Sequence, residues 1–246
     1  MADVLIPAWP APTHVRALQT LRTGGGSPAP WDSFNLGDHV GDDPARVAAN
    51  RAALRSLLPA EPCWLNQVHG TRVVDAASIV RNPVPHADAA FARQALTVCT
   101  VMTADCLPVL FCDRAGTVVA AAHAGWRGLL AGVLEATIEA MQVAPGELLA
   151  WFGPAIGAQR FEVGDEVRQL FVDHDDLVAE AFSAGTGDKW LADLYRIARH
   201  RLATCGVVAV YGGNICTFED SSRFFSYRRD GVTGRMASLI WLDTDH

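Results

Sequence analysis

Three residues, His69, Cys106 and His123, stand out because each lies in a short motif in which glycine or apolar residues surround a potential metal ligand. The motifs are Asn66-Gln67-Val68-His69-Gly70, Thr103-Ala104-Asp105-Cys106-Leu107-Pro108 and Ala122-His123-Ala124-Gly125-Trp126-Arg127-Gly128. Two imidazoles and one thiolate can bind a zinc ion and leave its fourth coordination position open, as catalytic zinc sites do. The same residues can instead form a cysteine–histidine nucleophile pair. The residue types alone leave both chemistries open.

A possible anion site follows the second histidine. The segment Gly125-Trp126-Arg127-Gly128 leads into a helix predicted to begin near Leu129. The first amides of a helix have free N–H groups, and an arginine beside them adds a charge-assisted contact to an anion. The alternative is an ordinary turn whose arginine is solvated.

The elements that position the cysteine and the second histidine form a predicted hairpin. Its parts are strands at 107–112 and 117–122 and a turn at 113–116, and a further strand is predicted before it at 96–102. If Asp113 and Thr117 face each other across the turn, antiparallel register places Cys106 opposite His123 or Ala124 at the open end. Spacing alone therefore predicts contact between the thiol and one imidazole. The other histidine lies in a separate segment that spacing does not place.

Further elements alternate less regularly between helix and strand. Asp43 and Pro44 are typical of a helix start, and this helix is expected to run to about Leu58. Apolar residues at helical spacing predict a helix from about Leu129 through Met141. A later helix is predicted over 188–203, with strands at 207–211 and 236–242. Helices mixed with hairpin-connected strands favour the α+β class over a doubly wound parallel sheet.

Composition narrows the class of protein. The chain has 246 residues, is 50% hydrophobic and shows no repeat or long linker, so we expect one domain over residues 1–246. A net charge of −7 without a basic block argues against nucleic acid or an anionic membrane as a partner. No obligate protein partner is indicated.

The sequence also bears on the compartment. No apolar run is long enough to span a membrane, and the first residues lack the pattern of a signal peptide. Six cysteines without a secretion signal are expected to be reduced. We therefore expect a cytoplasmic protein.

Together, the motifs resemble the YfiH-like laccase-domain family, also called multi-copper polyphenol oxidoreductase-like proteins and described as purine nucleoside phosphorylases. The resemblance spans nearly the whole chain. Besides the three motifs above, it includes 22–27, 35–42, 153–157, 161–164, 225–230 and 234–237. One small departure is Gly26, where the family more often has valine, and it affects the stiffness of that loop.

The resemblance implies a layered α+β sandwich of the α/β/β/α kind with mixed sheets. It also implies that His69, Cys106 and His123 bind a catalytic zinc. The implied reactions are phosphorolysis of adenosine, inosine, guanosine and methylthioadenosine, and hydrolytic deamination of adenosine. The expected partners are thus purine nucleosides and phosphate.

Roles for other residues are hypotheses built on this chemistry. Arg127 and the helix start are expected to hold phosphate. Asp105 is expected either to support the metal ligands or to transfer a proton. Weaker candidates for substrate contact are Arg22, Asn35 and Arg235.

Three alternatives remain. A copper (Cu2+) polyphenol oxidase is disfavoured because a multi-copper centre needs many clustered histidines, and the chain has eight with no His-x-His pair. A metal-free cysteine hydrolase would use Cys106 and His123. A partner protein of cell-envelope or division machinery would need no catalysis, and the glycine-rich polar cluster argues against it.

Overall fold

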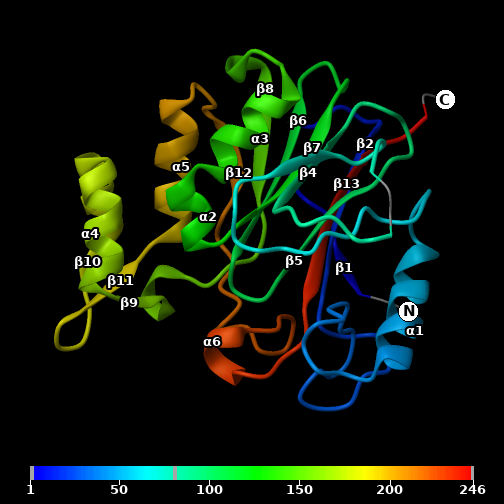
Figure 1. The fold of residues 1–246 in the computed structure, drawn as a ribbon, viewed down its shortest axis with the longest axis horizontal. Coiled ribbons are helices and arrows are strands. Elements are labelled where there is room, and N and C mark those ends of the chain that lie inside the picture. Colours follow the sequence, from blue (N-terminus) through cyan, green and yellow to red (C-terminus); the bar gives the residue numbers. More distant parts are fainter. Residues whose placement is uncertain (1–2, 80–81, 245–246) are drawn as a thin grey trace.

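The largest sheet is built around the hairpin that the sequence predicts. The computed structural model describes residues 3–79 and 82–244, and this sheet has the strand order β12-β8-β6-β7-β4-β3 (Figure 1). Its strands are β3 (Val73–Asp75), β4 (Ala89–Ala92), β6 (Leu107–Asp113), β7 (Val119–Ala124), β8 (Leu148–Phe152) and β12 (Ala209–Gly212). The outer pairs β12–β8 and β3–β4 are parallel and the inner ones antiparallel, so the sheet is mixed.

A second sheet packs against the first. Its order is β1-β2-β13-β5, with all pairs antiparallel. Its strands are β1 (Val4–Leu5), β2 (Val15–Thr20), β5 (Cys99–Thr103) and β13 (Met236–Leu242). Leu110 and Cys112 of β6 and Ile240 of β13 belong to one buried cluster between the two sheets.

Helices cover the outer faces of both sheets. Leu107, Val109 and Phe111 alternate with the residues that face the second sheet, and they pack with the helices on the opposite side. These helices are α2 (Trp126–Ala131), α3 (Val133–Met141) and α5 (Leu194–Thr204), while α1 (Pro44–Arg55) covers the second sheet. The layers are thus helix, sheet, sheet, helix, which confirms the expected α+β sandwich.

A small lobe lies beside the α5 layer (Figure 1). It is formed by the antiparallel sheet β10-β11-β9 and one helix. Its elements are β9 (Glu162–Gly164), α4 (Asp165–His174), β10 (Phe182–Ala184) and β11 (Lys189–Ala192). Short 3-10 helices occur at Pro145–Glu147, Ala158–Arg160 and Asp176–Ala181, and α6 (Tyr227–Asp230) precedes the last strand. The sequence predicted none of these lobe elements, and β11 lies within the range expected to be helical.

Several predicted boundaries are wrong, each for a local reason. The strand expected from residue 96 begins at Cys99, since Leu96 has φ of +63°, outside the extended region. The helix expected near Leu129 begins earlier and is divided at Gly132, whose φ of +99° ends α2 and starts α3.

The helix expected from residue 188 begins at Leu194. Residues 189–192 form β11 instead, and the Asp193 side chain caps α5 by accepting a hydrogen bond from the backbone N–H of Arg196 at 3.0 Å. The first helix starts as expected, with the Asp43 side chain accepting from the Ala45 N–H, but ends at Arg55 rather than near Leu58.

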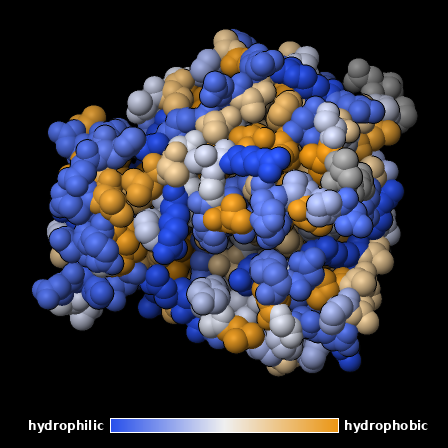
Figure 2. All heavy atoms as spheres, viewed as in Figure 1, coloured by the Kyte–Doolittle hydropathy of each residue, from blue (hydrophilic) through white to orange (hydrophobic). Residues whose placement is uncertain are grey.

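The face of the molecule viewed in Figure 1 is largely polar. Figure 2 shows apolar residues in small, separate groups on the face viewed in Figure 1. Among the described residues, no helix has both the length and the apolar character required to span a membrane. All six cysteines are free thiols.

Candidate metal centre and substrate pocket

The open end of the central hairpin brings the cysteine and the second histidine together. Pro108 pairs with His123 and Leu107 with Ala124, so Cys106 lies one step beyond the last pair, opposite Gly125. This register differs by a single residue from the predicted one. Alternate residues of a strand share a face, so Cys106 lies on the face of Pro108 and next to His123. Both side chains therefore point into the layer between the two sheets, at its end.

The first histidine is placed by a carboxylate from another segment. Asp88 precedes β4 and is fully buried, and its oxygens accept hydrogen bonds from the backbone N–H groups of Val68 (3.1 Å), His69 (2.9 Å) and Gly70 (2.7 Å). The same carboxylate accepts from Nδ1 of His123 at 2.8 Å. One side chain thus fixes the loop that carries one imidazole and the ring orientation of the other.

The three side chains converge closely enough to share one metal ion. Their ligand atoms all lie within 4.8 Å of one another, and Cys106 Sγ is 3.8 Å from His69 Nε2. A tetrahedral zinc ion with Zn–S of about 2.3 Å and Zn–N of about 2.0–2.1 Å needs only small side-chain shifts from this arrangement. A Cβ at Gly125 would lie 2.8 Å from Cys106 Sγ and 3.0 Å from His69 Cδ2, so this position must be glycine for the three to meet.

Electrostatics at the site favour a thiolate. Burial alone would raise the pKa of Cys106, but the charge of His123 and hydrogen bonds from both imidazoles outweigh it and lower the pKa to about 6. Burial would lower the pKa of His123, but the Cys106 thiolate and Asp88 raise it to about 9. Burial is likewise outweighed at Asp88, where His123 and the backbone donors hold the carboxyl pKa below its usual value. Cys106, His123 and Asp88 are therefore all charged, and the positive imidazolium stabilises the two negative groups beside it.

A pocket of about 500 Å³ opens in front of these residues. Its volume is within the usual range for small-molecule sites. His69 is exposed toward solvent, whereas His123 is only 3% exposed. The lining comprises His39, Gln67, His69, Met102, Thr103, Ala104, Asp105, Cys106, His123, Trp126, Arg127, Ile156, Phe161, Tyr227, Arg228 and Arg235.

The guanidinium groups of this pocket lack carboxylate partners. Within residues 3–79 and 82–244, Arg127, Arg228 and Arg235 form no ion pair, unlike exposed arginines nearby such as Arg160, which pairs with Glu219 at 3.2 Å. Burial lowers the pKa of Arg235, with Cys106 and Asp105 opposing the shift. The pocket therefore holds positive charge that an anionic ligand can neutralise.

The remaining predicted residues divide into two groups. Asp105, Arg127 and Arg235 line the pocket, but Arg22 and Asn35 do not. The Arg22 guanidinium lies in another hollow, 3.1 Å from Asp32 Oδ2. The Asn35 side chain is fully buried and its Oδ1 accepts the backbone N–H of Arg235 at 2.9 Å. Asn35 thus positions Arg235 rather than facing the pocket.

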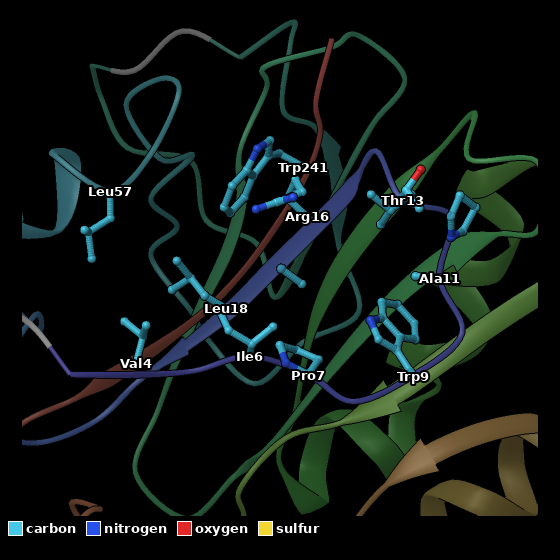
Figure 3. Close-up of a pocket in the computed structure, with 13 residues that line it drawn as sticks. Val4, Ile6, Pro7, Trp9, Ala11, Thr13, Arg16, Leu18, Leu57 and Trp241 are labelled. Carbon is cyan, nitrogen blue, oxygen red and sulfur yellow. The ribbon is translucent and has the colours of Figure 1, made fainter. Parts of the chain in front are cut away.

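A second hollow, of about 460 Å³, lies beside the second sheet (Figure 3). Val4, Ile6, Leu18 and Trp241 are among its apolar lining residues, and Arg16 is its one charged residue among those described. It contains no histidine, cysteine or carboxylate in that lining. This hollow therefore offers no metal-ligating side chain of these types among the described residues that line it, unlike the pocket at the hairpin end.

Comparison with known proteins shows the family of the chain. A family model described as multi-copper polyphenol oxidoreductase laccase matches residues 16–243. The chain belongs to this family. Within the laccase-domain family, a purine nucleoside phosphorylase of Pseudomonas aeruginosa is 56% identical over 97% of this chain and 98% of its own. The purine nucleoside phosphorylase YfiH of Escherichia coli is 52% identical over 98% and 100%.

Solved structures show the same fold. A Neisseria meningitidis protein of the family DUF152 superimposes with a TM-score of 0.95 at 53% identity, covering 98% of this chain and 100% of that one. The resemblance expected from the motifs is confirmed. The family name refers to several copper ions, whereas the described residues contain a single three-ligand group of histidine, cysteine or carboxylate.

Two residues important to this laccase-domain site were missed in the sequence. Asp88 lies in the segment Ala87-Asp88-Ala89-Ala90, where an isolated acid before a buried alanine-rich strand was the available signal. Arg228 lies in the matched stretch 225–230 but was not among the predicted site residues, and its guanidinium donates to the Glu162 carbonyl at 2.8 Å beside the pocket.

Replacing Asp88 should weaken metal binding even when the replacement is isosteric. Each carboxylate oxygen accepts a hydrogen bond from at least one backbone N–H, and a backbone N–H cannot rotate away. In Asp88→Asn the side-chain NH2 would therefore point at another donor and lose a hydrogen bond. We expect Asp88→Asn and Asp88→Ala each to reduce zinc affinity by about 10–100-fold, measured by competition with a chelator. Asp113→Asn is the control, and unchanged affinity in Asp88→Asn would refute this role.

Metal binding should release a proton at neutral pH. Between the pKa values of about 6 for Cys106 and about 9 for His123, the pair holds one proton that a metal must displace. We expect about one proton per zinc ion, measured by calorimetry at pH 7.5 in buffers of different ionisation enthalpy. Release of no proton would contradict the thiolate–imidazolium pair.

Proposed function

We propose that this protein is a zinc-dependent purine nucleoside phosphorylase with adenosine deaminase activity. The proposed substrates are adenosine, inosine, guanosine and methylthioadenosine, together with phosphate. Relatives at 48–56% identity that are named purine nucleoside phosphorylases support an enzyme of this class. The free thiols support a reducing, cytoplasmic setting.

The observation that carries this proposal is that three arginines without ion-pair partners among the described residues line the same pocket as the metal-capable residues. A phosphorolytic enzyme must hold a phosphate anion beside a nucleoside. The pocket that His69 and Cys106 line also holds three guanidinium groups that form no ion pair among the described residues, those of Arg127, Arg228 and Arg235. Guanidinium groups bind phosphate through charge-assisted hydrogen bonds. A metal-free cysteine hydrolase has no need of this charge.

The donor set fits zinc. His69, Cys106 and His123 would hold the ion, and the nearly buried His123 ring is oriented by a carboxylate, as metal-ligating histidines usually are. A bound zinc ion would supply Lewis acidity next to the substrate. One thiolate and two imidazoles do not supply enough ligands for several copper ions.

The chain's own residues account for substrate placement. The arginines would hold phosphate, and aromatic side chains such as Phe161, Trp126 and Tyr227 line the pocket as apolar surfaces for a purine. In phosphorolysis a phosphate oxygen bonds to C1′ as the C1′–N9 bond breaks, and the base leaves with the electron pair and takes a proton. Deamination adds water at C6 and releases ammonia. Proximity in one pocket serves both reactions.

Turnover of adenosine tests the proposal directly. We expect ribose-1-phosphate and adenine with phosphate present, and inosine from deamination, both lost on chelation and restored by zinc. His69→Ala should reduce metal content and activity nearly as strongly as Cys106→Ala, because both supply a ligand. Activity that survives chelation but not alkylation would instead support the cysteine hydrolase.

Removing a pocket arginine should act mainly on phosphate. Loss of one charge-assisted hydrogen bond, worth about 1.5–3 kcal/mol, predicts that Arg235→Ala raises the KM for phosphate about tenfold or more. Deamination, which uses no phosphate, should change less. Arg160→Ala, which removes an exposed paired arginine, is the control. An equal loss of both activities would argue against a phosphate role.

A further inference from the structure

The Asp105 side chain joins the metal-ligand loop to the C-terminal part of the chain. Its Oδ1 accepts from the Thr217 hydroxyl at 2.6 Å. Its Oδ2 accepts from the Ser226 hydroxyl at 3.0 Å and from the backbone N–H of Arg228 at 2.6 Å. The residue is only 8% exposed, so these bonds are largely shielded from water. All three donors lie more than one hundred residues away in sequence.

The backbone of the same residue is also constrained. Asp105 has φ of +94°, a conformation that residues with a Cβ rarely adopt, and its carbonyl accepts the Ile156 N–H at 2.9 Å. Such a conformation persists only where surrounding contacts hold it. Because Cys106 is the next residue, the direction of the thiol depends on this turn.

Two of the partners of Asp105 lie at the start of α6, a helix that lines the pocket. Ser226 is the N-cap of α6, and its hydroxyl oxygen accepts from the Arg229 N–H at 3.2 Å. Tyr227 and Arg228 are the first residues of α6 and line the pocket. The Asp105 carboxylate therefore contacts the start of the helix that presents an aromatic ring and a guanidinium to the substrate.

We propose that Asp105 is a positioning residue that sets the Cys106 ligand and the α6 wall as one unit, and that it transfers no proton in the reaction. The substrate part of this inference rests on the proposed function, whereas the metal part does not. Asp105 acts as an acceptor in all three side-chain contacts, and each donor is already directed at an oxygen.

Asparagine distinguishes positioning from proton transfer at this residue. Its carbonyl oxygen can replace Oδ2 and accept from Ser226 and Arg228, while its amide can donate to the Thr217 hydroxyl, which can rotate to accept. Asparagine also tolerates positive φ better than most residues. It therefore preserves the contacts but cannot act as a carboxylate acid or base.

The experiment compares Asp105→Asn, Asp105→Ala and Asp105→Gly in the full chain. We measure zinc affinity by chelator competition, the cobalt-substituted absorption spectrum, and kcat and KM for adenosine across pH. Asp105→Ala should lose about tenfold or more in zinc affinity and raise KM. Asp105→Gly relieves the backbone φ without restoring the hydrogen bonds, so it should resemble Asp105→Ala. Asp105→Asn should remain within about threefold of the parent in each quantity, with an unchanged pH profile.

Asp113 provides a matched control, because it ends the strand β6 that begins two residues after Asp105. Its buried carboxylate also accepts three hydrogen bonds, from the Thr117 N–H and hydroxyl and the Val118 N–H. Asp113→Ala should lower thermal stability without changing the cobalt spectrum or KM. This control separates the effect of losing a buried carboxylate from the effect of losing the link between Cys106 and α6.

Two results would overturn the proposal. If Asp105→Asn binds zinc normally but loses kcat as severely as Asp105→Ala, Asp105 transfers a proton. If Asp105→Ala binds zinc and substrate as the parent does, Asp105 positions neither.

If Asp105→Ala does not fold, the kcat and zinc affinity of Asp105→Asn still decide between positioning and proton transfer. If the parent turns over no nucleoside, the zinc affinities and cobalt spectra test the metal part alone, so failure of the proposed function is seen separately.

Discussion

The site depends on one buried carboxylate. Asp88 accepts hydrogen bonds from three consecutive backbone N–H groups of the His69 loop and from Nδ1 of His123. The loop has few other ties to the sheet, among them Gln67, whose amide exchanges two hydrogen bonds with the Met102 backbone. A buried, fully hydrogen-bonded charge costs much less than an unpaired one. The compensation within this network is what permits ionised groups at the end of an otherwise apolar layer.

The two sheets contribute different groups to the site around Asp88. The central hairpin supplies Cys106 and His123, and the absence of a side chain at Gly125 lets the three ligands approach. The segment that returns to the second sheet supplies Arg228 and Arg235. Asp105 lies where these two parts meet, with its carboxylate bonded to the start of α6. Two of the three pocket arginines thus come from a different segment than the metal ligands, while Arg127 follows the hairpin directly in α2. The layout of the pocket therefore depends on how the layers pack.

The sequence predicted the local parts of this account and missed most long-range ones. Strand β13 matches its predicted range, and the predicted hairpin register is off by only one residue. Both predictions come close because strand alternation and turn position are short-range properties of the sequence. The role of Asp88 was not predicted, since its hydrogen bonds join segments that only the fold brings together. Arg22 and Asn35 were chosen from motifs, and packing placed both outside the pocket. Family resemblance alone joined His69 to the other two ligands, and the structure brings all three within 4.8 Å.

X-ray absorption at the zinc edge of the purified, zinc-loaded protein would identify the atoms that bind the ion. We expect one sulfur ligand at about 2.3 Å and two imidazole nitrogens at about 2.0–2.1 Å, with the remaining position filled by a light, exchangeable atom. Cys106→Ser should remove the sulfur shell and leave the nitrogens. A sulfur-free zinc environment in the parent protein, or one with several sulfur ligands, would contradict a centre formed by His69, Cys106 and His123.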